Sequence, residues 1–156
     1  MITIRRAATA EEYAVARALF AEYQRAIGVD LCFQSFEREL ETLPEIYGPP
    51  GGALFLATRS TDGEAIGCAA LRGLEPGTCE MKRLYVRSGA RGHKLGRHLV
   101  EALLAEARRL GYARMRLDTL ETMVEARALY ASLGFREIQP YNEHAVEGTH
   151  FMELRL

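Results

Sequence analysis

The sequence predicts an α/β fold, with helices flanking a mixed β-sheet in a single domain of residues 1–156. First, the chain is long enough for one hydrophobic core, with 48% apolar and 26% charged residues among its 156. Second, apolar residues alternate in some stretches and recur every three or four positions in others, which indicates strands interleaved with helices. Third, a strand, a basic loop with glycines and a long helix follow one another between Glu80 and Leu110.

The N-terminal part predicts a strand and two helices. Ile2–Arg6 alternates apolar and polar residues, as a short strand does. Thr9 and Glu12 have the spacing of a capping box, so a helix begins there, and Gly28 ends it. Ser35 is placed to cap a second helix. The apolar residues on the inner side of that helix are Phe36, Leu40 and Leu43.

The middle of the chain predicts three strands in a meander. The proline- and glycine-rich residues 48–52 break the helical pattern. Ala53–Thr58 and Glu64–Leu74 read as two strands of a hairpin, because Thr61-Asp62-Gly63 between them is a turn signal. Thr78–Val86 is the third strand.

The C-terminal part predicts two helices and three strands. The helix that follows the basic loop has an apolar side and stops at Gly111. Ala113–Leu117 is a strand, parallel to the one before the helix if the crossover is right-handed. A shorter helix ends at Gly134. Phe135–Ile138 and His150–Leu154 are the closing strands.

Charge and composition exclude several classes of protein. The net charge of −1 lacks the basic excess of a nucleic-acid binder. Neither an apolar signal region nor a membrane-length apolar stretch is present, so we expect a cytoplasmic protein that binds no membrane. Cys32, Cys68 and Cys79 form no Cys-x-x-Cys pair and have no histidine at metal-ligand spacing, which predicts free thiols and no metal.

The loop between the third strand of the meander and the long helix is a candidate anion site. Gly92 and Gly96 leave room for a phosphate to approach the main chain, and Arg91, Lys94 and Arg97 add positive charge. The Gly-Lys-Ser/Thr of a P-loop and the dinucleotide fingerprint are both absent, which disfavours a nucleotide hydrolase. On spacing alone, a solvated basic turn explains the loop equally well.

Three motifs in this order resemble the GNAT superfamily of acyl-CoA N-acyltransferases. Arg91-Gly-His-Lys-Leu-Gly96 is similar to its Arg/Gln-x-x-Gly-x-Gly/Ala signature, and Lys82–Val86 and Leu129–Phe135 match two further parts of its pattern. The order of predicted elements agrees over nearly the whole chain. The resemblance implies the GNAT fold, which is a mixed and splayed sheet of six to seven strands flanked by about four helices.

The resemblance also implies acetyl-CoA as co-substrate and assigns residues to it. The pantetheine arm would lie along the strand at Leu84, Tyr85 and Val86, and a backbone amide at or beside Leu84 would face the thioester oxygen. The residues that would surround the pyrophosphate are Arg91, Gly92, His93, Lys94, Leu95, Gly96 and Arg97. The family commonly has an asparagine where this chain has Met123, so one contact to the cofactor arm is missing.

Two side chains are candidates for proton transfer. The resemblance makes Tyr130 the acid that protonates the CoA thiolate, whereas its helical position alone indicates a core tyrosine. Glu80 matches a catalytic glutamate of several family members and would take the amine proton, directly or through water. A solvent-facing strand carboxylate explains Glu80 equally well, and Glu121 is a weaker candidate.

These residues predict an N-acetyltransferase that moves an acetyl group from acetyl-CoA to a primary amine in a ternary complex. A small-molecule amine or amino acid is favoured over a protein as acceptor, and a homodimer stays open. A non-catalytic acyl-CoA-binding sensor with the same fold is the alternative. Candidate residues on the acceptor side, each of which also fits a core position, are Phe33, Phe36, Tyr47, Tyr141 and Asn142.

Overall fold

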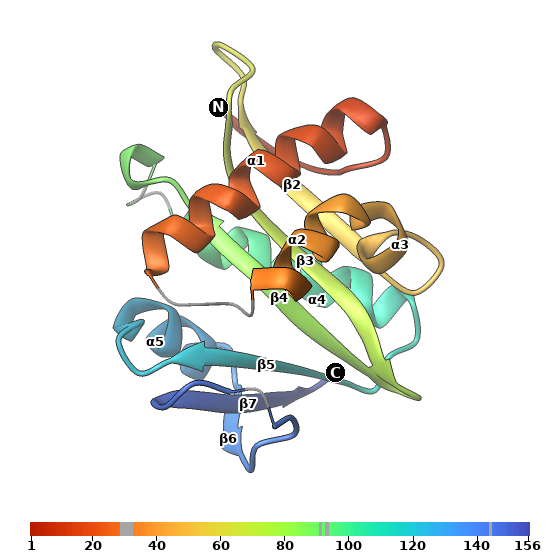
Figure 1. The fold of residues 1–156 in the computed structure, drawn as a ribbon, viewed down its shortest axis with the longest axis vertical. Helices are drawn as coiled ribbons and strands as arrows, with labels where there is room; N and C mark the ends of the chain where they lie inside the picture. The colour runs from red at the N-terminus through yellow and green to blue at the C-terminus, as the bar shows by residue number, and fades with distance from the viewer. Residues whose placement is uncertain (29–32, 91, 93, 144) are drawn as a thin grey trace.

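A computed structural model describes residues 1–28, 33–90, 92, 94–143 and 145–156 as one seven-stranded sheet with helices on both faces (Figure 1). The strand order is β1-β2-β3-β4-β5-β7-β6. The strands are β1 (Ile2–Arg6), β2 (Ala53–Arg59), β3 (Ala65–Glu75), β4 (Thr78–Val86), β5 (Arg114–Leu120), β6 (Arg136–Ile138) and β7 (Thr149–Arg155). The helices are α1 (Ala10–Ile27), α2 (Phe33–Glu41), α3 (Leu43–Tyr47), α4 (Leu95–Arg109) and α5 (Val124–Ser132), with a short 3₁₀ turn at Ser88–Ala90.

The sequence prediction is confirmed at the start of the chain. Thr9 Oγ1 accepts from Glu12 N at 3.1 Å, and Glu12 Oε1 accepts from Thr9 N at 3.0 Å, which completes the capping box of α1. Gly28 ends that helix with a φ of 64°, a left-handed conformation that glycine adopts at little cost.

Several boundaries differ from the prediction. The second helix begins at Phe33, so Ser35 lies inside it and is not its cap. Leu43 belongs to a separate helix, α3, because Pro44 lacks an N–H and fits only in the first turn of a new helix. The fifth strand also continues past Leu117 to Leu120, since β7 pairs with it along its whole length.

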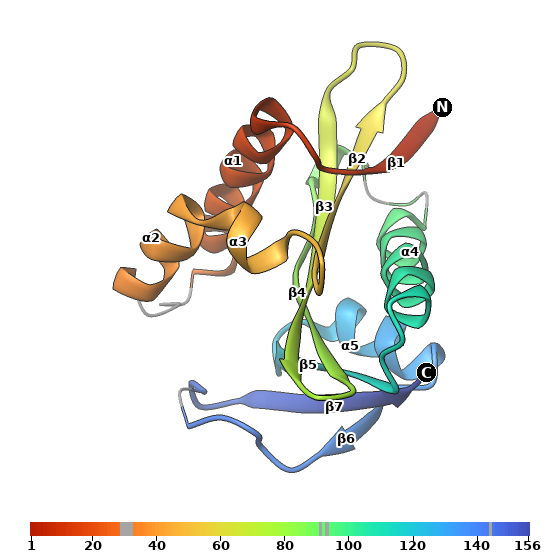
Figure 2. The ribbon, with the colours of Figure 1, turned by 90° about the vertical axis from the view of Figure 1, so that its right-hand side faces the viewer.

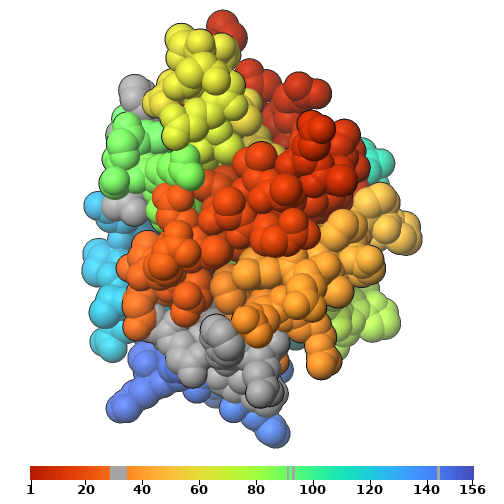
Figure 3. Space-filling model, turned by 45° about the horizontal axis from the view of Figure 1, so that its top comes forward, coloured from red at the N-terminus to blue at the C-terminus, as the bar shows by residue number. Residues whose placement is uncertain are grey.

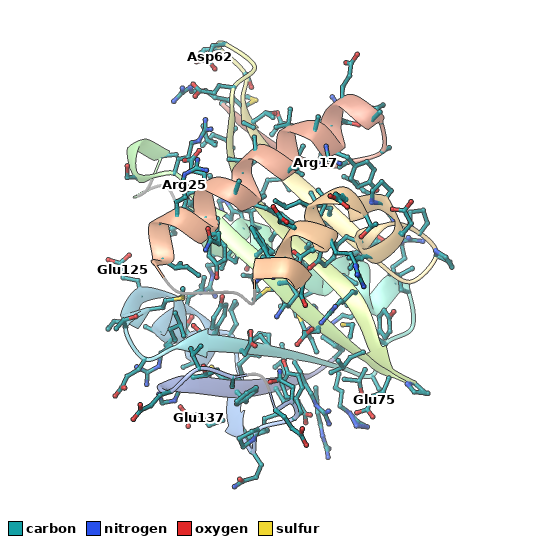
Figure 4. The ribbon with its side chains drawn as sticks, viewed as in Figure 1. Arg17, Arg25, Asp62, Glu75, Glu125 and Glu137 are labelled. Atoms are coloured by element: carbon teal, nitrogen blue, oxygen red, sulfur yellow. The ribbon has the colours of Figure 1, made fainter. Side chains whose placement is uncertain are left out.

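The helices cover opposite faces of the sheet. Figure 2 shows α1, α2 and α3 on one side and α4 on the other. Side chains alternate along β2, so Leu54 and Leu56 join a core with Phe20 of α1, whereas Ala53 and Ala57 join the core beneath α4. The two N-terminal helices are also tied together, because Arg17, which lies along α1 (Figure 4), donates its Nε–H to the Leu40 carbonyl at 2.6 Å.

The sheet opens between its two central strands. β4 and β5 are parallel but pair only over Thr78–Glu80 and Arg114–Arg116. Beyond these residues β5 continues to pair with β7, while β4 stays with β3. The splayed, mixed sheet that the sequence predicted is therefore confirmed, and its opening lies at the middle of β4.

Candidate active site

A β-bulge marks the point where β4 leaves β5. Cys68 of β3 pairs with Tyr85, and Ala70 pairs with Lys82, so β4 carries one extra residue across from Ala69. Arg83 occupies the bulge with a φ of 61°, which is an uncommon conformation for a residue other than glycine. The bulge changes the direction of the β4 backbone directly before Leu84.

A buried ion pair fixes that bulge to α2. Arg83 donates to both carboxylate oxygens of Glu39, with Nε–Oε2 at 2.9 Å and Nη2–Oε1 at 2.8 Å. The guanidinium also lies 5.3 Å from the centre of the Phe36 ring. Burial opposes the charge on Arg83, but the hydrogen bonds and the charge of Glu39 outweigh it and raise the pKa of Arg83. Arg83, with its unusual backbone conformation, is thus held in place by side chains of α2.

A cleft of about 610 Å³ lies over the divergence, between α1 and α2 on one side and β5 and the β6–β7 connection on the other. Figure 3 shows the surface of α1 directly beside that of α2 and α3 on this face. Across the opening, Lys82 Nζ lies 3.4 Å from Asp118 Oδ1. The charged residues that line the cleft are Arg38, Glu39, Arg72, Lys82, Arg83 and Asp118.

Glu80 is buried beside the cleft. Its side chain is 1% exposed, and Arg72 contacts Oε1 through Nε and Nη2, both at 2.9 Å. The Tyr141 hydroxyl donates to the other oxygen at 2.6 Å. Burial, together with the negative charge of Glu80, raises the pKa of Tyr141, so this phenol keeps its proton. Glu80 is therefore not the solvent-facing strand carboxylate that was one of its two interpretations from the sequence, but the centre of a buried hydrogen-bonded network.

Tyr130 lies on α5 in the core beneath the opening. Its side chain is 5% exposed, and its ring packs 5.7 Å from that of Phe135. Burial raises the pKa of Tyr130, and the nearby Tyr23 and Asp118 add to the rise. The raised pKa keeps Tyr130 a neutral O–H donor, and both Tyr23 and Asp118 line the cleft.

The loop before α4 presents the start of that helix. Gly92 has a φ of 97° and Lys94 a φ of 55°, so the chain turns sharply into the helix. Lys94 occupies the N-cap position, and its side chain makes no capping hydrogen bond because an ammonium group accepts none. The first amides of α4 are thus left without the side-chain cap that starts α1.

The family model of the acetyltransferase (GNAT) family matches residues 9–135. The chain belongs to this family. A protein of Schizosaccharomyces pombe, named as an uncharacterised N-acetyltransferase, is 42% identical over 139 residues, which are 88% of this chain and 85% of that protein. An N-acetylaspartate synthetase of Xenopus tropicalis is 32% identical over 109 residues, covering 69% of this chain but 40% of that protein. The crystal structure of a GNAT-family acetyltransferase from Staphylococcus aureus superposes with a TM-score of 0.83 and 20% identity over 99% of both chains.

The GNAT fold and acetyltransferase activity that the sequence predicted are therefore confirmed. Members of the family use acetyl-CoA as co-substrate. Among the described residues, no cluster of three or more His, Cys, Asp or Glu could hold a metal ion, and no helix is both long and apolar enough to cross a bilayer.

Several predicted acceptor-side and catalytic residues are placed clearly by this GNAT structure. Phe36 and Asn142 line the cleft, and Tyr141 contacts Glu80. Tyr47 is fully buried in the core, so it is not a contact residue. Glu121 is exposed and does not line the cleft. The side chain of Phe33 lies outside what the structure describes.

The predicted cofactor residues lie on β4, at or just before the start of α4, or outside the described part of the chain. Leu84, Tyr85 and Val86 lie on β4 beyond the bulge, and Leu95 and Gly96 open α4. Arg97 Nη1 donates to Ser132 Oγ of α5 at 3.2 Å. Arg91 and His93 lie outside the described residues. Met123 lines the cleft, and its sulfur accepts a hydrogen bond from Thr119 Oγ1 at 3.6 Å.

The two cysteines that the structure describes, Cys68 and Cys79, are not nucleophiles in this site. Burial raises the pKa of Cys79 to about 12, and burial raises that of Cys68 further. Both thiols are free and buried, as the sequence predicted, and Cys32 lies outside the described residues.

Sequence reasoning missed the charged wall of the cleft. Arg38 and Glu39 lie between the apolar positions of the second predicted helix, and Arg72 lies within a predicted strand. Asp118 lies beyond the end, at Leu117, that was predicted for its strand. Each of these patterns is ordinary by itself. A usable signal was the run Arg-Leu-Asp-Thr at 116–119, where the alternation continues past the end that we predicted for that strand.

Proposed function

We propose that this protein transfers the acetyl group of acetyl-CoA directly to a primary amine of a small molecule or amino acid. The observation that carries the proposal is the opening between β4 and β5, which has the start of α4 on one face and the charged cleft on the other. A donor and an acceptor can approach the bulge from opposite sides of the sheet. The N-acetylaspartate synthetase relative supports an amino acid as the acceptor.

The donor side fits a diphosphate and an extended arm. Uncapped amides at the start of α4 bind an anion well, because they are donors at the positive end of a helix dipole. Lys94 and the Gly92 turn lie at that end, and we assign the pyrophosphate to residues 91–97. The pantetheine arm would lie in the opening along Leu84–Val86, where β5 has separated from β4.

The reaction balances with groups of this chain. The neutral amine attacks the thioester carbon, a C–N bond forms and the C–S bond breaks. The nitrogen then loses a proton, which through water replaces the one that Tyr130 gives up. The Leu84 amide, which the bulge directs, would stabilise the oxyanion. Tyr130 would give its proton to the departing thiolate, because the phenol is neutral and carries the proton that the thiolate needs. The products are an N-acetylated acceptor and CoA with a free thiol.

The amine must lose a proton before it attacks, and we assign that proton to Glu80 through water. At 1% exposure, the Glu80 carboxylate has no direct access to an acceptor in the cleft. Asp118 also lies at the opening, where Lys82 contacts it, and its side chain is 30% exposed. Its position makes it the natural comparison for Glu80.

Release of free CoA thiol against a panel of amines tests the proposal. We expect acetyl-CoA-dependent turnover with at least one small amine, and binding of acetyl-CoA without turnover would overturn it. The variants Glu80→Gln and Asp118→Asn form a matched pair. We expect Glu80→Gln to lower kcat by about 100-fold and Asp118→Asn by less. A larger loss in Asp118→Asn would move the base to Asp118.

A further inference from the structure

The charges that line the cleft do not cancel. Among the lining residues that the structure describes, four are cationic and two are anionic. Glu39 neutralises Arg83 through the two-pronged pair, and Asp118 faces Lys82. Arg38 and Arg72 remain, and the only further acid that contacts either of them within the described residues is the buried Glu80.

Arg72 keeps donors to spare. Its Nε and Nη2 both contact the same oxygen of Glu80, so Nη1 and the second Nη2 hydrogen lie outside that contact. The side chain is 39% exposed and forms part of the cleft wall. A guanidinium in this state can grip a carboxylate with its open edge.

Arg38 is the surplus cation. It lies on α2, one position before Glu39, and its exposed side chain forms no ion pair with any residue that the structure describes. Arg38 lines the same cleft as Arg72, from α2 rather than from β3. With Glu80 counted, the described residues of the cleft carry one positive charge more than they balance.

We infer that the acceptor carries a carboxylate, which Arg38 and Arg72 hold in this cleft. This inference rests on the proposed function, because it names the class of amine that is acetylated. An amine with no acidic group enters as a cation and is repelled by the surplus positive charge. An aminocarboxylate brings its own anion, so that the carboxylate binds the two arginines while the amine faces the bulge at Leu84.

Acceptor pairs that differ only in the carboxylate test this inference. Free amino acids and their carboxamides are offered with acetyl-CoA, and the CoA thiol is measured. We expect kcat/KM to be at least about 10-fold higher for the acids, as a charge-assisted hydrogen bond to one arginine would give. Equal rates for acids and amides would overturn the inference and leave the transferase proposal standing.

Variants of Arg38 show whether the preference resides in the cleft. We expect Arg38→Gln to raise KM for the acids about 10-fold with little change in kcat, to leave the amides unchanged, and Arg38→Lys to restore part of the loss. Arg136→Gln, an exposed change on β6 outside the cleft, is the matched control and should alter neither. An unchanged acid preference in Arg38→Gln contradicts the assignment.

A binding measurement separates this inference from the proposed activity. Calorimetric titration of acids and amides into the CoA-saturated protein needs no turnover. If no acceptor releases CoA but acids bind at least about 10-fold more tightly than amides, the transferase proposal fails and the carboxylate site stands. If acids and amides bind equally, the carboxylate site fails.

Discussion

The two halves of β4 differ although they form one continuous strand. Thr78–Met81 is buried, and most of it pairs with β3 on one side and β5 on the other. Lys82–Val86 is half-buried, contains the bulge and has left β5. The first half therefore contributes to the stability of the core, whereas the second half borders the opening where we propose that the reaction takes place. The comparison shows that one strand can both anchor a core and border a site, provided that other residues fix the backbone at the bulge between its two halves.

The largest effect is expected from removing Glu39, the residue that holds Arg83 at the bulge. In Glu39→Ala, Arg83 would remain buried without its partner, which costs about 3–5 kcal/mol of unfolding free energy and lowers Tm by about 10 °C. We also expect kcat to fall, since the bulge that directs Leu84 loses its external support. Denaturant unfolding and CoA release measure the two effects.

Glu37→Ala, an exposed change on the same helix, is the control and should leave both quantities near those of the unmodified protein. If Glu39→Ala is destabilised while kcat is unchanged, the backbone alone maintains the bulge.

A change in the closed half should affect stability and spare binding. Met115 is fully buried and pairs with Cys79 in the short parallel ladder. Met115→Ala leaves a cavity there, and we expect a loss of about 3 kcal/mol in unfolding free energy. The KM for acetyl-CoA should not change, and a clear rise in KM would show that the two halves are not separate.

A change beneath the open half should lower turnover and leave stability almost unchanged. Tyr130→Phe keeps the ring packed against Phe135 and removes the proposed acid. We expect kcat to fall about 100-fold with less than about 1 kcal/mol of stability lost. Full turnover by Tyr130→Phe with every active acceptor would return Tyr130 to a purely structural role.

The smallest expected effect lies at the far end of β4 and depends on pH. Arg87, just after β4, donates to Glu22 of α1, and this hydrogen bond lowers the pKa of Glu22 below its ordinary value of 4.5. The pair therefore stabilises the fold above pH 4.5, and this contribution disappears as pH falls through the lowered pKa.

Glu22→Gln tests that pair. We expect it to cost less than about 1 kcal/mol near pH 7, because the pair is partly exposed, with the difference from the unmodified protein vanishing toward pH 3. Unfolding free energies measured across this range give the comparison, and a difference that grows on acidification would contradict the assignment.

The sequence predicted most of the fold because its elements carry strong local signals. The bounds of β1 and β4 and the capping box of α1 agree with the structure, since alternation and caps are encoded within a few residues. The boundary between α2 and α3 was not predicted, because the apolar residues Phe36, Leu40 and Leu43 keep a helical spacing up to Pro44.

The candidate site could be predicted only where it is encoded locally. The loop at 91–97 and Tyr130 belong to short motifs, so the sequence alone makes them candidates. The Glu39–Arg83 pair joins residues 44 positions apart, and nothing near either residue indicates its partner. The burial of Glu80 likewise depends on Tyr141, which reaches it from 61 positions away.

The outer strands of the sheet bear on how this protein behaves at high concentration. Exposed strand edges promote aggregation by pairing with other chains, and long apolar edges are the most hazardous. Here the two margins are β1, which ends in Arg5 and Arg6, and the three-residue β6, which carries Arg136 and Glu137. Because both edge strands are short and charged, they offer a neighbouring molecule few backbone groups to pair with. We therefore expect the protein to resist aggregation during the titrations described above.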